Sequence, residues 1–304
     1  MDLTIAIPSQ VELAETPIWD SRRSCLYWTD LLGCQVHRFT PGNGQDEAWD
    51  VHSLVGSAVP TSDEDRVLCA LSGGMYLLDT RDGSLEFLVD PKGGDTNFRY
   101  NDTRVDAKGR IFTSTMSVFY GTPEYDPETM KGNFYRVDTD GSVHVVQAGI
   151  DQFNCVLWNL ENTRLYVVDT YNKKLLAAEY DLETGRCGPL EVAVDCTELG
   201  MPDGMAMDTA GDLYLCHWTG HITVWSPDLR LLEDIPFPVE YATCCGFGGG
   251  DMKTLYVTSS HRRYPPEKIL QYPSAGSTFQ MRREIAGCPD HFFKIWDLQQ
   301  ERER

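Results

Sequence analysis

A short motif recurs six times along the chain, and this repeat restricts the possible folds more than any other feature. Each copy combines a polar turn with alternating apolar residues, as in the stretch Pro202–Cys216, PDGMAMDTAGDLYLC. Such alternation, bounded by turn residues, is typical of paired β-strands. The first apolar residue after each turn marks the repeats at intervals of 41 to 54 residues, at Leu26, Val67, Ile111, Leu165, Leu213 and Leu255.

Repeats of this length, with about four short strands each, are typical of the blades of a β-propeller. We therefore predict an all-β fold, a six-bladed β-propeller, that forms a single domain over residues 1–304. A blade cannot bury its own faces, so the blades must pack around a common axis. A β-sandwich or jelly roll is the rival fold, but it does not repeat a turn motif at this interval. The segment Leu3–Leu13 reads as a further strand that pairs with the last blade.

The innermost strand of each propeller blade lines the central channel, so equivalent positions of the repeats face one another across the axis. Counting back ten or eleven residues from the six markers gives a largely polar set: Glu15, Ser57, Asn101, Asn154, Asp203 and Cys245. We predict that these residues converge as a polar ring at one mouth of the channel. Each of these residues, taken alone, could simply form hydrogen bonds with backbone groups at a solvated channel. For any single position this is the simpler explanation.

Carboxylate and amide oxygens suit a hard divalent cation. We expect Glu15, Asn154 and Asp203 to bind it, because two carboxylates that meet at an axis repel each other unless a cation lies between them. The prediction is one divalent metal ion. Ca²⁺ is the ion we expect first, and Zn²⁺, Mn²⁺ or Mg²⁺ remain open because oxygen ligands alone do not separate them.

The chain resembles the family of senescence marker protein 30, gluconolactonase and regucalcin, from about Pro8 to Gly287. The matching segments include AETPIWDSRRSCLYWTD, RYNDTRVDAKGRIFTSTM, FNCVLWNLENTRLYVVD, PDGMAMDTAGDLYLCHW and CCGFGGGDMKTLYVTSS. The resemblance implies a six-bladed propeller with one divalent metal near the axis. By this resemblance, the family's metal ligands correspond to Glu15, Asn154 and Asp203, and the family's substrate-binding residues correspond to Arg99 and Asn101.

Two departures from the family pattern concern the substrate. Thr103 follows Asn101-Asp102 where the family often has Gly, and no carboxylate follows Met116 until Glu124. Residues 117–133 lengthen the third repeat and could form either a lid or a plain surface insertion. The identity of the sugar therefore stays open.

The leading functional hypothesis is a metal-dependent lactonase that opens a small-molecule sugar lactone, an aldonolactone, to the aldonic acid. The metal would polarise the carbonyl, Asp203 would be the catalytic base, and Arg99 and Asn101 would hold the sugar. Two alternatives remain: a non-catalytic propeller that binds calcium or another ligand, as regucalcin does, and a metal-dependent esterase.

The net charge of −20 argues against nucleic-acid and anionic-membrane partners and predicts an acidic channel that favours a neutral lactone. The first ten residues do not resemble a signal peptide, and no apolar stretch is long enough to span a membrane, so we expect a cytoplasmic protein. The ten cysteines are expected to be free thiols, and the protein to be a monomer or a weak homo-oligomer.

Two further sites are left open by the sequence. Trp218 lies at the end of a predicted strand, where its ring could stack on a sugar or simply pack. The basic pair Arg262-Arg263 could meet a carboxylate or phosphate of a substrate, although a solvated loop is the reading we favour.

Overall fold

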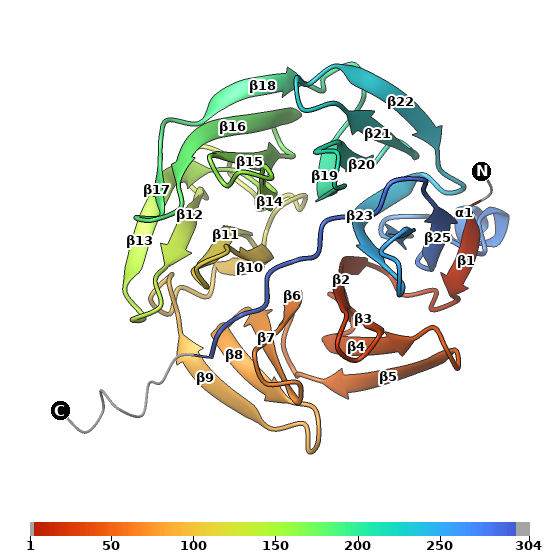
Figure 1. The fold of residues 1–304 in the computed structure, drawn as a ribbon, viewed down its shortest axis with the longest axis horizontal. Helices are drawn as coiled ribbons and strands as arrows, with labels where there is room; N and C mark the ends of the chain where they lie inside the picture. Colours follow the sequence, from red (N-terminus) through yellow and green to blue (C-terminus); the bar gives the residue numbers. More distant parts are fainter. Residues whose placement is uncertain (1–2, 296–304) are drawn as a thin grey trace.

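Six small antiparallel sheets form a ring around a central axis in the computed structural model, which describes residues 3–295 (Figure 1). The fold is therefore the predicted six-bladed β-propeller. Each of the six sequence markers lies on the second strand of its sheet. The innermost strands contact one another in sequence around the ring, and the first contacts the last.

Each of the first three blades is a four-stranded meander that runs outward from the axis. Blade 1 contains β2 (Ala14–Asp20), β3 (Cys25–Asp30), β4 (Gln35–Thr40) and β5 (Gln45–Asp50). Blade 2 contains β6 (Val55–Pro60), β7 (Arg66–Leu71), β8 (Gly74–Asp79) and β9 (Leu85–Val89). Blade 3 contains β10 (Phe98–Val105), β11 (Ile111–Ser117), β12 (Gly132–Val137) and β13 (Val143–Ile150).

Blade 5 follows the same plan, whereas blades 4 and 6 vary it at their outer edges. Blade 4 contains β14 (Phe153–Trp158), β15 (Arg164–Asp169), β16 (Lys174–Asp181), β17 (Arg186–Cys187) and β18 (Glu191–Asp195). Blade 5 contains β19 (Pro202–Met207), β20 (Leu213–His217), β21 (His221–Trp225) and β22 (Leu231–Pro236). Blade 6 contains β23 (Tyr241–Gly248), β24 (Thr254–Ser260) and β25 (Thr278–Arg282), with the short helix α1 (Pro266–Gln271) inserted before β25.

The N-terminal strand β1 (Thr4–Ile7) closes the ring. It pairs antiparallel with β25 and so becomes the fourth strand of blade 6, which confirms the predicted pairing with a shorter strand than expected. The edge of β25 is thereby covered by the other end of the chain.

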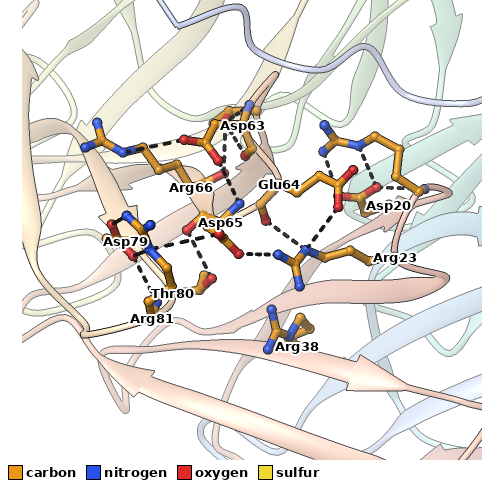
Figure 2. A network of polar contacts seen from close by, with 12 residues as sticks. Asp20, Arg23, Arg38, Asp63, Glu64, Asp65, Arg66, Asp79, Thr80 and Arg81 are labelled. Carbon is orange, nitrogen blue, oxygen red and sulfur yellow. Dashed lines mark hydrogen bonds and ion pairs between the residues drawn. The ribbon is translucent and has the colours of Figure 1, made fainter.

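Burial falls from the axis to the rim. All seven residues of β2 are buried, whereas β5 and β13 are mostly exposed. Apolar clusters fill the spaces between neighbouring blades; one of them joins Val59 and Leu68 of blade 2 to Tyr100 and Ile111 of blade 3. Blades 1 and 2 are also joined at the surface by ion pairs, in which Arg23 contacts Asp65 (Figure 2).

A strap formed by residues 287–295 crosses the ring at one end of the channel (Figure 1). At its start Cys288 donates its backbone N–H to the Met207 carbonyl of blade 5, at 2.8 Å. At its end Phe293 donates to the Pro60 carbonyl of blade 2, at 2.9 Å, and its ring is completely buried. The strap thus ties together two blades that do not contact each other along the ring.

Every innermost strand carries a β-bulge near the same point. One extra residue on the inner strand opposes the second strand, as between Glu15 and Ile18 or between Pro202 and Met205. A bulge bends its strand and redirects the adjacent side chain. The polar residues at one end of the channel lie at these bulges.

Within residues 3–295, no helix is long and apolar enough to cross a membrane.

All ten cysteines are free thiols, and Cys34, Cys187 and Cys288 are only partly buried.

Candidate active site and metal centre

A cavity of about 290 Å³ opens at the end of the channel opposite the strap. Four of the six residues expected in the polar ring line it: Glu15, Asn101, Asn154 and Asp203. They come from the inner strands of blades 1, 3, 4 and 5, and each is at most 6% exposed. The repeat alignment therefore brings together, across the axis, side chains that are far apart in the sequence.

The other two residues expected in the ring, Ser57 and Cys245, do not line this cavity, so that part of the prediction is wrong. The Ser57 hydroxyl accepts a hydrogen bond from the Thr103 backbone N–H at 2.8 Å, and the Cys245 thiol faces the Tyr214 carbonyl in the core. Strand pairing instead makes Gly56 and Thr243 the equivalents of Glu15. Counting from the markers missed this shift because the turns and bulges differ between blades.

Glu15 and Asp203 form a buried acidic pair. Burial raises the pKa of Glu15 well above its usual range, and the charges of Asp203 and Asp102 raise it further. Burial likewise raises the pKa of Asp203. Among the described residues, Glu15 Oε2 has no hydrogen-bond partner although it is buried. Two desolvated carboxylates that repel each other are costly unless a positive charge compensates them.

The Asp203 carboxylate is held on both sides. Asn154 Nδ2 donates to Asp203 Oδ1, and Trp218 Nε1 donates to Asp203 Oδ2. The indole of Trp218 also packs on Tyr241, with ring centroids 4.7 Å apart. Of the two roles open to Trp218, the structure shows packing, together with a hydrogen bond that the sequence did not suggest.

The donor set fits a divalent cation. It supplies carboxylate oxygens from Glu15 and Asp203, and Asn154 can present its amide oxygen after a half-turn of the side chain. No cluster of three His, Cys, Asp or Glu side chains suited to a metal is found in residues 3–295. The proposed ligands Glu15, Asn154 and Asp203 comprise two carboxylates and one amide, so they do not form a cluster of that kind. The unpartnered Glu15 Oε2 is the observation that favours a cation here.

Arg99 and Asn101 are fixed beside this set. Arg99 Nη1 donates to the Tyr100 carbonyl at 3.0 Å and to Asn101 Oδ1 at 3.1 Å. Asn101 Nδ2 donates to the Phe153 carbonyl at 2.9 Å. Burial, followed by the charge of Arg262, lowers the pKa of Arg99 to about 10, so the guanidinium remains charged at neutral pH. The remaining N–H groups of Arg99 are available to a ligand.

Asp102 is a buried acid that the sequence analysis did not select. It is 1% exposed, and Thr16 Oγ1 donates to its Oδ1 at 3.0 Å. Burial raises its pKa. Asp102 follows Asn101 on β10, and successive side chains of a strand point in opposite directions. This alternation was the sequence signal for a second layer of polar side chains beneath the one that lines the cavity.

The segment 117–133 reaches the cavity through one side chain. Tyr120 lines it, and the Tyr120 ring packs edge-on against Tyr125 at 5.3 Å. Tyr125 in turn donates its hydroxyl to Asp151 Oδ1 at 3.1 Å. The segment is thus folded against blade 4. Glu240, Tyr241, Arg262 and Arg263 also line the cavity, from the side of blade 6.

Comparison with known proteins gives a consistent result. The family model described as SMP-30/Gluconolactonase/LRE-like region matches residues 13–261. The 6-deoxy-6-sulfogluconolactonase of Pseudomonas putida is 30% identical over 289 residues, which cover 92% of this chain and 94% of that protein. Regucalcin of Danio rerio is 29% identical over 300 residues, covering 94% and 96%. The calcium-binding protein regucalcin from Agrobacterium tumefaciens has a similar structure, with a TM-score of 0.88 and 25% identity, covering 95% of this chain and 96% of that one.

Proposed function

The chain belongs to the SMP-30/gluconolactonase/LRE-like family, and we propose that it is a metal-dependent lactonase that opens a sugar lactone to the aldonic acid. The observation that carries the proposal is the unpartnered, buried Glu15 Oε2 beside Asp203, in a cavity that also presents Arg99 and Asn101. The sugar lactonases among the relatives support the reaction class. The cavity, at about 290 Å³, is close to the lower end of the volumes found for small-molecule sites.

Glu15, Asn154 and Asp203 would hold the metal, with Ca²⁺ as the first candidate and Zn²⁺, Mn²⁺ or Mg²⁺ as alternatives. When bound, a divalent cation supplies Lewis-acid polarisation of a carbonyl. The regucalcin relatives, one of them a calcium-binding protein, support calcium.

Asp203 is the proposed general base. Its carboxylate lines the cavity beside the other proposed metal ligands, where it can accept a proton from a water molecule. Trp218 fixes its orientation through Oδ2, and this contact does not depend on which way the Asn154 amide points. Asp203 accepts a proton from the attacking water as the water oxygen bonds to the carbonyl carbon. The ring C–O bond then breaks, and the ring oxygen takes up this proton from Asp203 and leaves as a hydroxyl.

Arg99 and Asn101 are the proposed substrate-binding residues. Arg99 donates to Asn101 and to the backbone through Nη1, so its other N–H groups can face sugar hydroxyls or the oxygen that gains negative charge. Both side chains are almost fully buried, so they are positioned before the substrate arrives.

The test is acid release from a panel of aldonolactones by metal-stripped protein, with Ca²⁺, Mg²⁺, Mn²⁺ or Zn²⁺ restored one at a time. We expect metal-restored hydrolysis above the spontaneous rate. Metal binding without any acceleration would favour the alternative of a non-catalytic calcium-binding propeller, and acceleration only on acyclic esters would favour an esterase.

A further inference from the structure

Two consecutive arginines reach the candidate active site from the turn that follows β24. Arg262 and Arg263 both line the cavity, together with Arg99. The turn is closed by a hydrogen bond of 2.9 Å from the Tyr264 backbone N–H to the His261 carbonyl. Arg263 has a φ of +66°, a conformation that costs free energy for any residue other than glycine. The backbone therefore accepts strain at the residue that extends its guanidinium toward the cavity.

The guanidinium of Arg263 reaches across the mouth to blade 3. It lies directly against Gly121, in the 117–133 segment, where any β-carbon would collide with it. Its charge also acts on the hydroxyl of the neighbouring Tyr120. Gly121 has a φ of +78°, and the lack of a side chain there leaves the space that the arginine occupies. The arginine pair thus forms part of the rim of the cavity.

Neither arginine has an acidic partner. In residues 3–295 no carboxylate oxygen is within 4.0 Å of either guanidinium, and the same holds for Arg99. This is unusual in a chain with 46 acidic and 26 basic residues, because most other arginines of the described chain form ion pairs. The network between blades 1 and 2 illustrates the contrast, since Arg23, Arg66 and Arg81 all contact carboxylates there (Figure 2).

The carboxylates near the cavity are already engaged or too distant. Glu240 lines the cavity but forms an ion pair with Lys268. Glu12 is exposed and affects Arg262 only through the electrostatic attraction between their charges, without an ion-pair contact. Burial and the charge of Arg263 lower the pKa of Arg262, as expected for like charges held together. If Glu15 and Asp203 are neutralised by the proposed cation, the cavity retains three unpaired positive charges.

We propose that the substrate is a lactone with a second, anionic group away from its carbonyl, and that Arg262 and Arg263 bind this group. Guanidinium groups pair with phosphate, sulfonate or carboxylate oxygens through several directed hydrogen bonds, so the shared chemistry is a terminal oxyanion on the sugar chain. The inference rests on the proposed lactonase activity, and it assigns Arg262 and Arg263 a role in substrate specificity.

The experiment compares kcat/KM for a neutral aldonolactone with kcat/KM for its 6-phospho, 6-sulfo and 6-carboxylate counterparts. The enzymes are the wild type, the double variant Arg262→Gln/Arg263→Gln, and the control Arg164→Gln/Arg186→Gln. The control removes the same charge from two exposed arginines that do not line the cavity. The three anionic lactones separate the possible sources of the oxyanion.

We expect the wild type to favour at least one anionic lactone, and the double variant to lose about 100-fold on that lactone but less than about threefold on the neutral one. The control should retain the preference. Equal losses on both lactones, or no preference in the wild type while the neutral lactone is hydrolysed, would overturn the inference and leave the lactonase proposal intact. If no lactone is hydrolysed, the lactonase proposal fails. Calorimetric titration with 6-phosphogluconate then decides whether Arg262 and Arg263 bind the oxyanion. Equal affinities of the wild type and the double variant would refute this binding role as well.

Discussion

The indole N–H of Trp218 donates a hydrogen bond to Asp203 Oδ2, from the end of the neighbouring strand in the same blade. It fixes one oxygen of the carboxylate while Asn154 contacts the other. The residue proposed as base is therefore oriented by a side chain that does not itself need to touch the reacting atoms.

Trp218→Phe is expected to lower kcat/KM on the preferred lactone by about 10-fold to 100-fold, because a hydrogen bond to a charged group contributes about 1.5–3 kcal/mol. The measurement is steady-state kinetics at saturating metal. Trp49→Phe is the matched control, since Trp49 donates to the Thr80 carbonyl, far from the cavity. Equal effects of the two substitutions would contradict a specific role for Trp218.

Glu15→Gln and Asp203→Asn are expected to reduce turnover by about 1,000-fold or more while the fold survives, because each removes a charge that the metal requires. In metal-free buffer, Glu15→Gln should leave the melting temperature unchanged or raise it, since the substitution removes an unpartnered buried charge.

We expect Ca²⁺ to raise the melting temperature of the wild type, and we expect Glu15→Gln to lose this increase. Calorimetric scans with and without Ca²⁺ make this comparison. A full calcium-dependent shift in Glu15→Gln would exclude Glu15 as a ligand.

Gly56 is required by the close approach of β6 to β10. A β-carbon at this position would lie 2.6 Å from the Asn101 carbonyl oxygen. Gly56→Ala should therefore destabilise the protein by about 1–3 kcal/mol and lower activity by displacing Asn101. Gly42→Ala is the control, because no atom lies within 4 Å of a β-carbon there. Denaturant titration of both variants should separate them, and equal stability would show that β10 adjusts without cost.

His217 should make the fold sensitive to acid. Burial, followed by the nearby charge of His221, lowers the pKa of His217 to about 3, so the ring is neutral in the folded protein. The unfolded chain takes up a proton near pH 6.5, so between pH 6.5 and 3 the unfolded state binds more protons and stability decreases as the pH falls.

For the single group, the loss between pH 6.5 and pH 4.5 is about 2 kcal/mol. His217→Gln should have a flatter stability profile over this interval, measured by urea unfolding at several pH values. His52→Gln, at an exposed position, should keep the wild-type slope. If the stability profiles of His217→Gln and the wild type coincide, His217 does not contribute to the loss of stability at low pH.

The six blades could be predicted because the repeat is carried by turns and apolar alternation, which are local. Four channel positions followed from the same repeat, since Glu15, Asn101, Asn154 and Asp203 each lie a similar distance before a marker. Ser57 and Cys245 were misplaced because bulges and turn lengths shift the register by one or two residues. No local pattern reports that kind of shift.

The arginines show a different limit of the sequence. The net charge of −20 predicted an acidic channel, yet Arg262 and Arg263 line the cavity together with Arg99, which the family resemblance had already assigned to substrate binding. Whether an arginine is paired depends on which carboxylates the fold brings near it, from its own blade, as for Arg110 and Asp106, or from a neighbouring blade, as for Arg23 and Asp65. The contact of Trp218 with Asp203 likewise arises only once β19 and β20 are paired.

The strap has a consequence for how small molecules enter and leave. Below the cavity, Thr16, Asp102 and Arg104 are at most 3% exposed, and Asp290 of the strap lies 3.6 Å from the Arg104 guanidinium. Within residues 3–295, buried side chains thus fill the central channel between the cavity and the strap. For the proposed lactonase, substrate and product would therefore pass through the same mouth of the cavity, on the side away from the strap.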